Sequence, residues 1–228
     1  MKIGLIGGSG YAGGELLRLI AQHPHFEVAA VSAHSNAGEL ITAIHPHLTS
    51  YSGQTFSAFN AKDYSNCEVI FLALPHGESA KIIEQLPSSA KIVDLGADYR
   101  LTSEESWKKY YGGDYAGSWT YGITDLPGKA AEISAATKVA NPGCYATAIA
   151  LSAAPAGPFA DFSDIVVVAA SGTTGAGRTA KINLIASEVA GSLTSYKFGG
   201  VHQHTPEIEQ ALSAVSQKEA KISFTPIL

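Results

Sequence analysis

The sequence has few cysteines and few basic residues, and each shortage disfavours a class of protein. Its 228 residues hold two cysteines, Cys67 and Cys144, with no CxxC or metal-type spacing. We therefore expect neither a disulfide scaffold nor a bound metal. Fifteen Lys and Arg stand against 20 Asp and Glu, for a formal net charge of −5. With no basic run either, nucleic-acid binding is disfavoured.

Long apolar runs are also missing from the sequence. No stretch approaches about 18 apolar residues, so we expect no membrane-spanning helix and no membrane partner. Met1 and Lys2 lead straight into an apolar run, which is not the pattern of a signal peptide. At 46% hydrophobic residues, the chain is predicted to be a globular, cytoplasmic protein with a sizeable core, in one large domain or two small ones.

The N-terminus has the pattern of a dinucleotide-binding fingerprint. An apolar strand over 2–6 precedes a glycine-rich turn over 7–14 and a helix over 15–22. Gly7 allows the tight turn, Gly10 lets a pyrophosphate approach the backbone, and Gly13 lets helix and strand pack closely. The phosphates are expected on the N-terminus of the helix. A purely structural glycine turn is the alternative.

The residues after the second predicted strand, over 26–31, bear on the choice of cofactor. An NAD site typically places Asp or Glu there to bind the ribose 2′-hydroxyl. This chain instead has hydroxyls and an imidazole, at Ser32, His34 and Ser35. Those groups suit a 2′-phosphate, so the sequence favours NADP(H).

Two more strands are predicted in the first half, over 68–74 and 91–94, with a helix over 78–86 between them. Ligands bind at the carboxyl ends of strands in open α/β sheets. Candidate residues at these ends are His76, Asp94, Asp98 and Arg100. Capping and surface pairing explain them equally well. Residues 102–136 are predicted to be rich in loops, with an aromatic cluster that packs them or contacts substrate or another subunit.

A single thiol follows a rigid turn at residues 141–145. Proline fixes φ and glycine permits unusual backbone angles, so Cys144 is predicted in the first turn of a helix over 146–151. The N–H groups and the positive dipole end there favour a thiolate. A small buried hydrophobe is the other interpretation of Cys144. It is our interpretation of Cys67, which begins an apolar run.

The second half supplies a further loop and a histidine. A β-branched strand over 164–170 leads into a donor-rich loop over 171–178, which ends in Arg178 and suits a cofactor or phosphate. Thr205 is predicted to cap a helix over 207–215, with Pro206 at its first position. His202 lies just before this helix, where it could serve as the base that an activated thiol needs.

An ordered set of motifs spans essentially the whole chain. They are the glycine turn at 7–13, LPHG at 74–77, DLGADYRL at 94–101, YG at 121–122, NPGCY at 141–145, SGTTGAGR at 171–178 and HQHTPEI at 202–208. Together they resemble the N-acetyl-γ-glutamyl-phosphate reductases of arginine biosynthesis. That family is related to aspartate-β-semialdehyde dehydrogenase and shares its acyl-enzyme chemistry.

The resemblance implies an α/β fold with two domains. Residues 1–143 would form an NADP-binding Rossmann domain with a doubly wound sheet. Residues 144–228 would form a mixed α/β domain for catalysis, substrate and subunit contacts. Relatives continue well beyond the position of Leu228, so the resemblance also implies that this second domain is incomplete. The expected assembly is a homodimer or homotetramer.

The resemblance also implies a reaction and its residues. NADPH would reduce N-acetyl-γ-glutamyl phosphate, a small-molecule acyl phosphate, to the semialdehyde and phosphate through a Cys144 thioester. His202 would be the acid/base, and Glu207 would orient His202 or bind substrate. Cofactor positions carried over by motif are Gly7, Ser9, Gly10, Tyr11, Ala12, Gly13, Ser32, His34, Ser35, Leu74, Pro75, His76, Ser171, Gly172 and Gly175. Substrate positions are Arg100, Asn141 and Arg178.

Two alternatives stay open at this point. The same Cys–His chemistry would serve a dehydrogenase acting on aspartyl or aminoadipyl phosphate, since only the substrate pocket differs. A chain without the C-terminal part could also be a catalytically silent nucleotide-binding protein. One departure from the family pattern concerns the cofactor, because His34 stands where relatives often carry Arg.

Overall fold

The computed structural model describes residues 1–228, which form two compact units. The first comprises Met1–Tyr99 with Ala135–Asn141, and the second Arg100–Ser134 with Pro142–Leu228. The chain thus enters the second unit, returns to the first for one strand, and leaves it again. Each unit has its own core.

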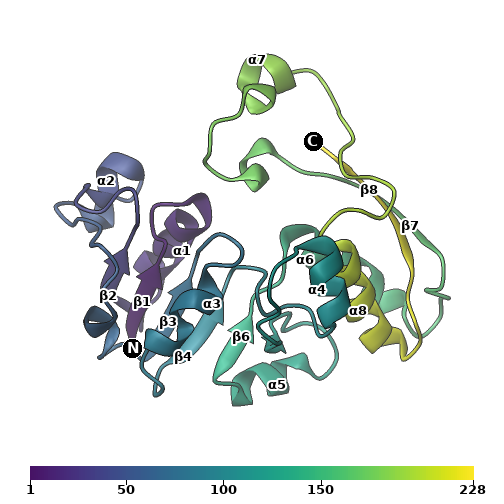
Figure 1. Ribbon diagram of the computed structural model, residues 1–228, viewed down its shortest axis with the longest axis horizontal. Coiled ribbons are helices and arrows are strands. Elements are labelled where there is room, and N and C mark those ends of the chain that lie inside the picture. Colours follow the sequence, from purple (N-terminus) through teal and green to yellow (C-terminus); the bar gives the residue numbers. More distant parts are fainter. The chain divides into compact units, whose positions relative to one another are not determined.

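A parallel sheet organises the first unit. Its strands, labelled in Figure 1, are β1 (Lys2–Ile6), β2 (Glu27–Ser32), β3 (Val69–Leu72), β4 (Lys91–Asp94) and β6 (Lys138–Ala140). They lie in the order β2-β1-β3-β4-β6, and every neighbouring pair is parallel. After β2 the chain crosses to the other side of β1, so the sheet is doubly wound. Its switch point lies between β1 and β3, where such sheets bind ligands at their carboxyl ends.

Helices and short turns cover both faces of this sheet. They are α1 (Tyr11–Gln22), α2 (Ile41–Ile44) and α3 (Ser79–Ile82), with 3-10 turns η1 (Thr49–Tyr51), η2 (Ala61–Tyr64) and η3 (Ile83–Gln85). Leu16 and Ile20 of α1 pack against Ile3 of β1. On the opposite face the Tyr64 ring fills the space over Gly4. The helix predicted over 78–86 is divided between α3 and η3.

The second unit is built on two helices and a parallel strand pair. Its elements are α4 (Glu104–Tyr110), β5 (Thr120–Tyr121), α6 (Cys144–Ala153), η4 (Ala154–Ala156), β7 (Ile165–Ala170), η5 (Thr173–Ala176), η6 (Ile182–Leu184), α7 (Ala186–Val189), α8 (Thr205–Ser216) and β8 (Ile222–Ile227). Helix α5 (Lys129–Ala135) ends where the chain returns to the first unit. β7 and β8 pair along their whole length.

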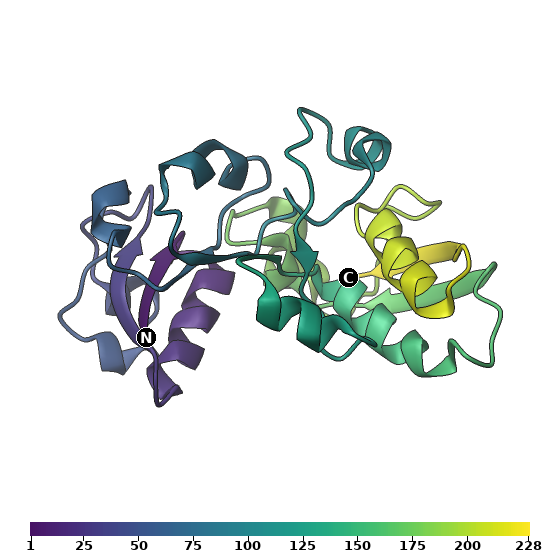
Figure 2. The same cartoon turned by 90° about the horizontal axis from the view of Figure 1, so that it is seen from below.

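Helices α6 and α8 pack on one face of the β7–β8 pair. Figure 2 shows α8, in yellow, beside these strands. The core between them includes Tyr145, Ile149, Ile208, Leu212 and Phe224. The other face of β7 stays uncovered, with Val166 74% and Val168 65% exposed. In neither unit does any helix combine the length and the apolar character needed to cross a membrane.

The observed units differ from the predicted division at one segment. Residues 100–134 belong with the second unit, although the sequence division at 143/144 assigned them to the first. The reason is hydrogen bonding to α8: Thr102 bonds to Gln210, and Tyr121 to Glu207. This segment is also more regular than expected, since it contains α4 and most of α5.

Candidate active site

The glycine turn between β1 and α1 has the geometry of a nucleotide-binding loop. Gly7 has φ +89°, and a Cβ there would meet the Ala73 carbonyl. A Cβ on Gly13 would lie 2.5 Å from the Gly7 oxygen and 2.8 Å from the Gly8 Cα. Glycine is therefore required at both positions, one for the turn and one for close packing, as the fingerprint predicts.

The N-terminus of α1 suits a pyrophosphate. No side chain caps the helix, and its first turn carries no acidic residue. A Cβ on Gly10 would have no neighbour closer than 3.8 Å, so the turn is open on this side. The N-terminus of a helix, at the positive end of its dipole, is a common site for anions. The residues present thus fit a dinucleotide cofactor.

A histidine that the sequence did not single out supports this turn from behind. His45 is only 4% exposed, and its Nε2 lies 2.9 Å from the Gly8 carbonyl oxygen. Because a carbonyl can only accept, Nε2 must carry the proton. The ring occupies the place where Gly14 would have a Cβ. The fingerprint does not explain Gly14, and this extra glycine is the one feature of the sequence that indicates a side chain packed against the turn.

One predicted cofactor contact is wrong in its side chain. Ser32 is buried, with its Oγ 2.6 Å from the Tyr64 hydroxyl, so a phosphate cannot reach it. Its carbonyl instead accepts the N–H groups of Gly7 and Gly8 and holds the glycine turn. His34 and Ser35 are exposed after β2, and their contact with a cofactor stays a prediction.

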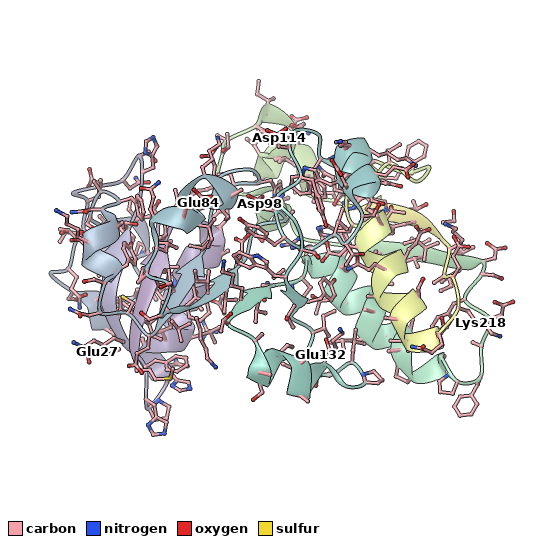
Figure 3. The ribbon with its side chains drawn as sticks, turned by 60° about the horizontal axis from the view of Figure 1, so that its bottom comes forward. Glu27, Glu84, Asp98, Asp114, Glu132 and Lys218 are labelled. Atoms are coloured by element: carbon pink, nitrogen blue, oxygen red, sulfur yellow. The ribbon has the colours of Figure 1, made fainter.

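The loops after β3 and β4 are joined by hydrogen bonds. Asp98, labelled in Figure 3, accepts from the N–H of Gly77 at 2.6 Å and of Ala80 at 3.1 Å. In return, the Ala97 N–H donates to Nδ1 of His76. Asp94 accepts from Ser79 Oγ and the Gly96 N–H. The buried aspartates therefore tether loops.

The remaining candidates in these loops keep surface for a ligand. Leu74 is half-buried, and Pro75 and His76 are exposed. Because His76 Nδ1 accepts a hydrogen bond, the proton of a neutral ring lies on Nε2. At the carboxyl end of β3, this turn offers an N–H donor beside the switch point.

The thiol of Cys144 lies at the first residue of α6, as predicted. Gly143 precedes it as the N-cap in extended conformation, and no side chain caps the helix. Cys144 is exposed, while Pro142, Gly143 and Tyr145 around it are buried. Cys67, by contrast, is buried as predicted, and burial raises the pKa of its thiol. Only Cys144 is both accessible and at a helix N-terminus.

His202 is a buried, neutral imidazole near this turn. It is 6% exposed, and its ring centroid lies 5.5 Å from that of Tyr145. Burial, with smaller contributions from His204 and Lys197, lowers the pKa of His202 to about 4. Its Nδ1 accepts the His204 N–H at 3.0 Å, so the proton of the neutral ring is on Nε2. This tautomer makes His202 a hydrogen-bond donor.

A second histidine lies close to the thiol turn. His204 Nε2 occupies the place where Gly143 would have a Cβ. Arg100 Nη1 would lie 2.9 Å from that Cβ. His204 was not among the predicted site residues. Thr205, predicted as the N-cap of α8, is instead its first residue after the N-cap His204. The Thr205 hydroxyl is buried without a hydrogen-bond partner.

Glu207 connects several of these residues. It is completely buried, and its Oε1 accepts from the Gly143 N–H and the Tyr121 hydroxyl, each at 2.8 Å. Its Oε2 lies 3.5 Å from Arg100 Nη1. Arg100 is buried and lies close to the thiol turn, and its contact with substrate stays a prediction. Tyr121 was noted in the sequence only as part of the aromatic cluster.

The remaining predicted residues lie on the surface. Gly172, Gly175 and Arg178 are exposed in the loop that contains η5, and Ser171 is half-buried. Asn141 is exposed at the end of the first unit, where its N–H donates to the Asp94 carbonyl. The glycine turn belongs to the first unit, and the thiol, His202 and the 171–178 loop to the second.

Two families match the chain, and the segment matched by the first includes residues 100–134 of the second unit. Residues 2–136 match the family described as "Semialdehyde dehydrogenase, NAD binding domain". Residues 144–228 match "Semialdehyde dehydrogenase, dimerisation domain". Solved structures of similar fold include aspartate semialdehyde dehydrogenase II from Vibrio cholerae, with TM-score 0.68 at 13% identity over 99% of this chain and 69% of that one. The Candida albicans enzyme, solved with NADP, gives 0.64 at 14% over 99% and 67%.

Curated relatives are much closer in sequence. The N-acetyl-gamma-glutamyl-phosphate reductase of Acidothermus cellulolyticus is 55% identical over 229 residues, and that of Salinispora arenicola 50% over 230. Each match covers all of this chain and 67% of the relative, so the chain spans about two thirds of their length. The doubly wound nucleotide domain, the exposed thiol and these matches lead to one assignment: the chain belongs to the semialdehyde dehydrogenase family, among its N-acetyl-gamma-glutamyl-phosphate reductases.

Proposed function

We propose that this protein uses NADPH to reduce N-acetyl-γ-glutamyl phosphate to N-acetylglutamate semialdehyde and phosphate, a step of arginine biosynthesis, through a thioester on Cys144. The observation that carries the proposal is the exposed thiol at the uncapped N-terminus of α6. The substrate follows from the names of relatives at 45–55% identity. A cytoplasmic location is part of the proposal.

The thiol of Cys144 performs the first step. The thiol first loses its proton to solvent, and the thiolate sulfur then forms a bond to the acyl carbon. The carbon–oxygen bond to phosphate breaks, and phosphate leaves as the anion with the electron pair. Phosphate is already a good leaving group, so no strong acid is needed. A thioester is more electrophilic than a carboxylate, which is the reason for covalent catalysis here.

Hydrogen-bond donors around the thiol would stabilise the oxyanion. The first-turn N–H groups of α6 have no partners within the helix. His202 is a neutral ring with its proton on Nε2, so it donates to oxygen without bringing a full charge. When the tetrahedral oxyanion collapses to the aldehyde, the sulfur leaves as the Cys144 thiolate with the electron pair of the carbon–sulfur bond, so this step takes no proton from the neutral His202 ring. We assign His202 this donor role and assign Arg100, with Arg178, to the anionic groups of the substrate.

The cofactor would be held mainly by the first unit. The glycine turn with Ser9, Tyr11 and Ala12 would take the pyrophosphate, and the exposed His34 and Ser35 the 2′-phosphate. No acidic residue occupies the position after β2 that would favour NAD. Leu74, Pro75 and His76 would line the site at β3. When bound, NADPH supplies the hydride that reduces the thioester carbon.

Separate substitutions of the two free cysteines test the thioester mechanism directly. Cys144→Ser should lower the rate of acyl-phosphate reduction at least about a thousandfold while NADPH binding stays intact. Cys67→Ala is the matched control, since Cys67 is buried away from solvent. Rates with aspartyl and aminoadipyl phosphates, measured beside the acetylglutamyl substrate, decide among the three substrates. A Cys144→Ser protein of near-normal rate would refute the thioester mechanism.

The histidines need a comparison of their own. His202→Gln should reduce kcat much more than it weakens NADPH binding, because the variant keeps volume and loses the ring donor. His204→Gln is the parallel variant, since His204 lies closer to Gly143. If only His204→Gln reduced kcat, the donor role would pass from His202 to His204.

If iodoacetamide labelled Cys144 sluggishly and NADP did not protect it, the chain would be a silent nucleotide-binding protein.

A further inference from the structure

The carboxylate of Glu207 is committed to three donors within the second unit. These residues, the Glu207 network, are Glu207, Tyr121, Gly143 and Arg100. An ionised carboxylate with no exposed surface is tolerated only when its oxygens accept hydrogen bonds or face a cation. Glu207 has both: two bonds of 2.8 Å at Oε1 and Arg100 at Oε2. Its hydrogen-bonding capacity is used internally, so it is poorly suited to bind substrate.

Tyr121 is a permanent donor in this network. Burial and the adjacent Glu207 charge raise the pKa of the Tyr121 hydroxyl, so it remains protonated throughout the working range of an enzyme. A protonated phenol beside a carboxylate gives a short, charge-assisted hydrogen bond. Tyr121 is in β5, 86 residues before Glu207 in the chain, so the bond ties a distant strand to the first turn of α8.

The third partner, Gly143, connects the Glu207 carboxylate to the residue that carries the thiol. Its N–H donates to the same Oε1 that accepts the Tyr121 hydroxyl. Gly143 is the N-cap of α6, and Cys144 is the next residue. Glycine has the greatest backbone freedom of all residue types. The hydrogen bond from the Gly143 N–H therefore restricts the backbone directly before Cys144. The place of a Cβ on Gly143 is filled by His204 and Arg100.

We propose that Tyr121 and Glu207 are positioning residues that hold Gly143, and through it the sulfur of Cys144, in the orientation needed for attack. The inference rests on the proposed function in that Cys144 is the nucleophile. It gives Glu207 a task different from orienting His202 or binding substrate. It also adds a residue, Tyr121, to those on which the reaction depends.

Replacing one hydroxyl tests the proposal. Tyr121→Phe removes the donor and keeps the ring, and Tyr115→Phe is the matched control, since its hydroxyl donates at 2.8 Å to the Leu101 carbonyl instead. We expect Tyr121→Phe to slow both iodoacetamide alkylation of Cys144 and kcat about tenfold or more, since small displacements of a reacting group are costly. The KM for the acyl phosphate and the Kd for NADPH should change less than about threefold. Tyr115→Phe should leave all four values near those of the unmodified protein.

A second variant makes the test independent of how well the first one folds. Glu207→Gln keeps the volume and an acceptor oxygen for Tyr121 and Gly143, and loses the charge that faces Arg100. If the network acts as one unit, the double variant Tyr121→Phe/Glu207→Gln should be no slower than the slower single variant. Fully additive effects would overturn the proposal. So would a Tyr121→Phe protein that alkylates at the same rate as Tyr115→Phe.

The two proposals fail in different ways. If Cys144→Ser keeps its rate, the thioester mechanism is refuted whatever Tyr121 does. If Cys144 is essential and Tyr121→Phe behaves like its control, only the positioning role is refuted. A Glu207→Gln protein with normal alkylation and a shifted pH–rate profile would return Glu207 to the role of orienting His202.

Discussion

Single residues in the second unit combine burial with chemistry, and His202 is the clearest case. An imidazole normally titrates near pH 6.5, where it would be charged in half the molecules. Inside the pocket formed by Tyr145, Tyr196 and Phe224, charging is disfavoured. The nearby charged or titratable groups are His204, Lys197 and Glu207, and only Glu207 favours the protonated ring. The residue is thus specialised as a neutral donor.

This burial predicts a pH dependence of stability. Because the folded pKa of about 4 lies below the ordinary 6.5, the unfolded chain binds more protons between these values. The stabilisation is therefore present above pH 6.5 and is lost as the pH falls toward 4. Between pH 7 and pH 5 we expect His202 to cost about 2 kcal/mol of unfolding free energy.

Urea denaturation at the two pH values checks this. His202→Gln should show a smaller loss of unfolding free energy than the unmodified protein, by about the same 2 kcal/mol. His34→Gln is the control, since His34 is exposed. An equal pH dependence in the unmodified and His202→Gln proteins would mean that the buried ring does not resist protonation.

At the level of elements, the turn from β1 to α1 separates two roles of glycine. A methyl group on Gly10 meets nothing closer than 3.8 Å, whereas on Gly13 it meets backbone at 2.5 Å. Gly10→Ala should therefore fold normally and bind NADPH at least about tenfold more weakly, because the methyl occupies the pyrophosphate position. Gly13→Ala should lower the melting temperature by several degrees. Calorimetry and NADPH fluorescence titration measure both, and equal stability of the two variants would contradict the assigned roles.

His45 makes a related prediction for the same element. His45→Phe keeps a ring over Gly14 and removes the hydrogen bond to the Gly8 carbonyl. A buried carbonyl left without its donor costs about 1–3 kcal/mol, and the turn proposed to hold the pyrophosphate loses support. We expect NADPH affinity to fall about three- to tenfold with no change in Cys144 alkylation. Unchanged affinity would reduce His45 to a packing residue.

Elements with local signals could be predicted from the sequence, and contacts between distant residues could not. β4 has the predicted bounds, and the thiol opens α6 as predicted, since proline and glycine fix that turn. The capping error at Thr205 came from a rule that favours threonine at N-caps and does not see the buried hydroxyl. Tyr121 bonds to Glu207, 86 residues away, and His45 to Gly8, 37 residues away. Patterns in the local sequence do not indicate such bonds.

At the scale of the whole molecule, each unit hydrogen-bonds its own loops. In the first unit Asp94, at the end of β4, and Asp98 after it bond to the segment that follows β3. In the second unit, Glu207 and Gln210 of α8 bind the segment from Arg100 to Tyr121 through hydrogen bonds and an ion pair. The sequence motifs DLGADYRL and HQHTPEI therefore have internal partners as well as ligand candidates. A motif residue can be required for the site without touching substrate.

The uncovered face of β7 leads to the last prediction. Val166 and Val168 project from the side of the β7–β8 pair opposite α6 and α8, in the segment that matches a dimerisation domain. Burying two valines contributes about 3 kcal/mol or more, which corresponds to roughly a hundredfold in a dissociation constant. If this face joins two copies in a homodimer, Val166→Glu/Val168→Glu should sediment as a monomer at concentrations where the unmodified protein is dimeric. Phe159→Glu, at another exposed apolar residue of the second unit, should remain dimeric. A double variant that stays dimeric with normal Cys144 alkylation would place the subunit contact elsewhere.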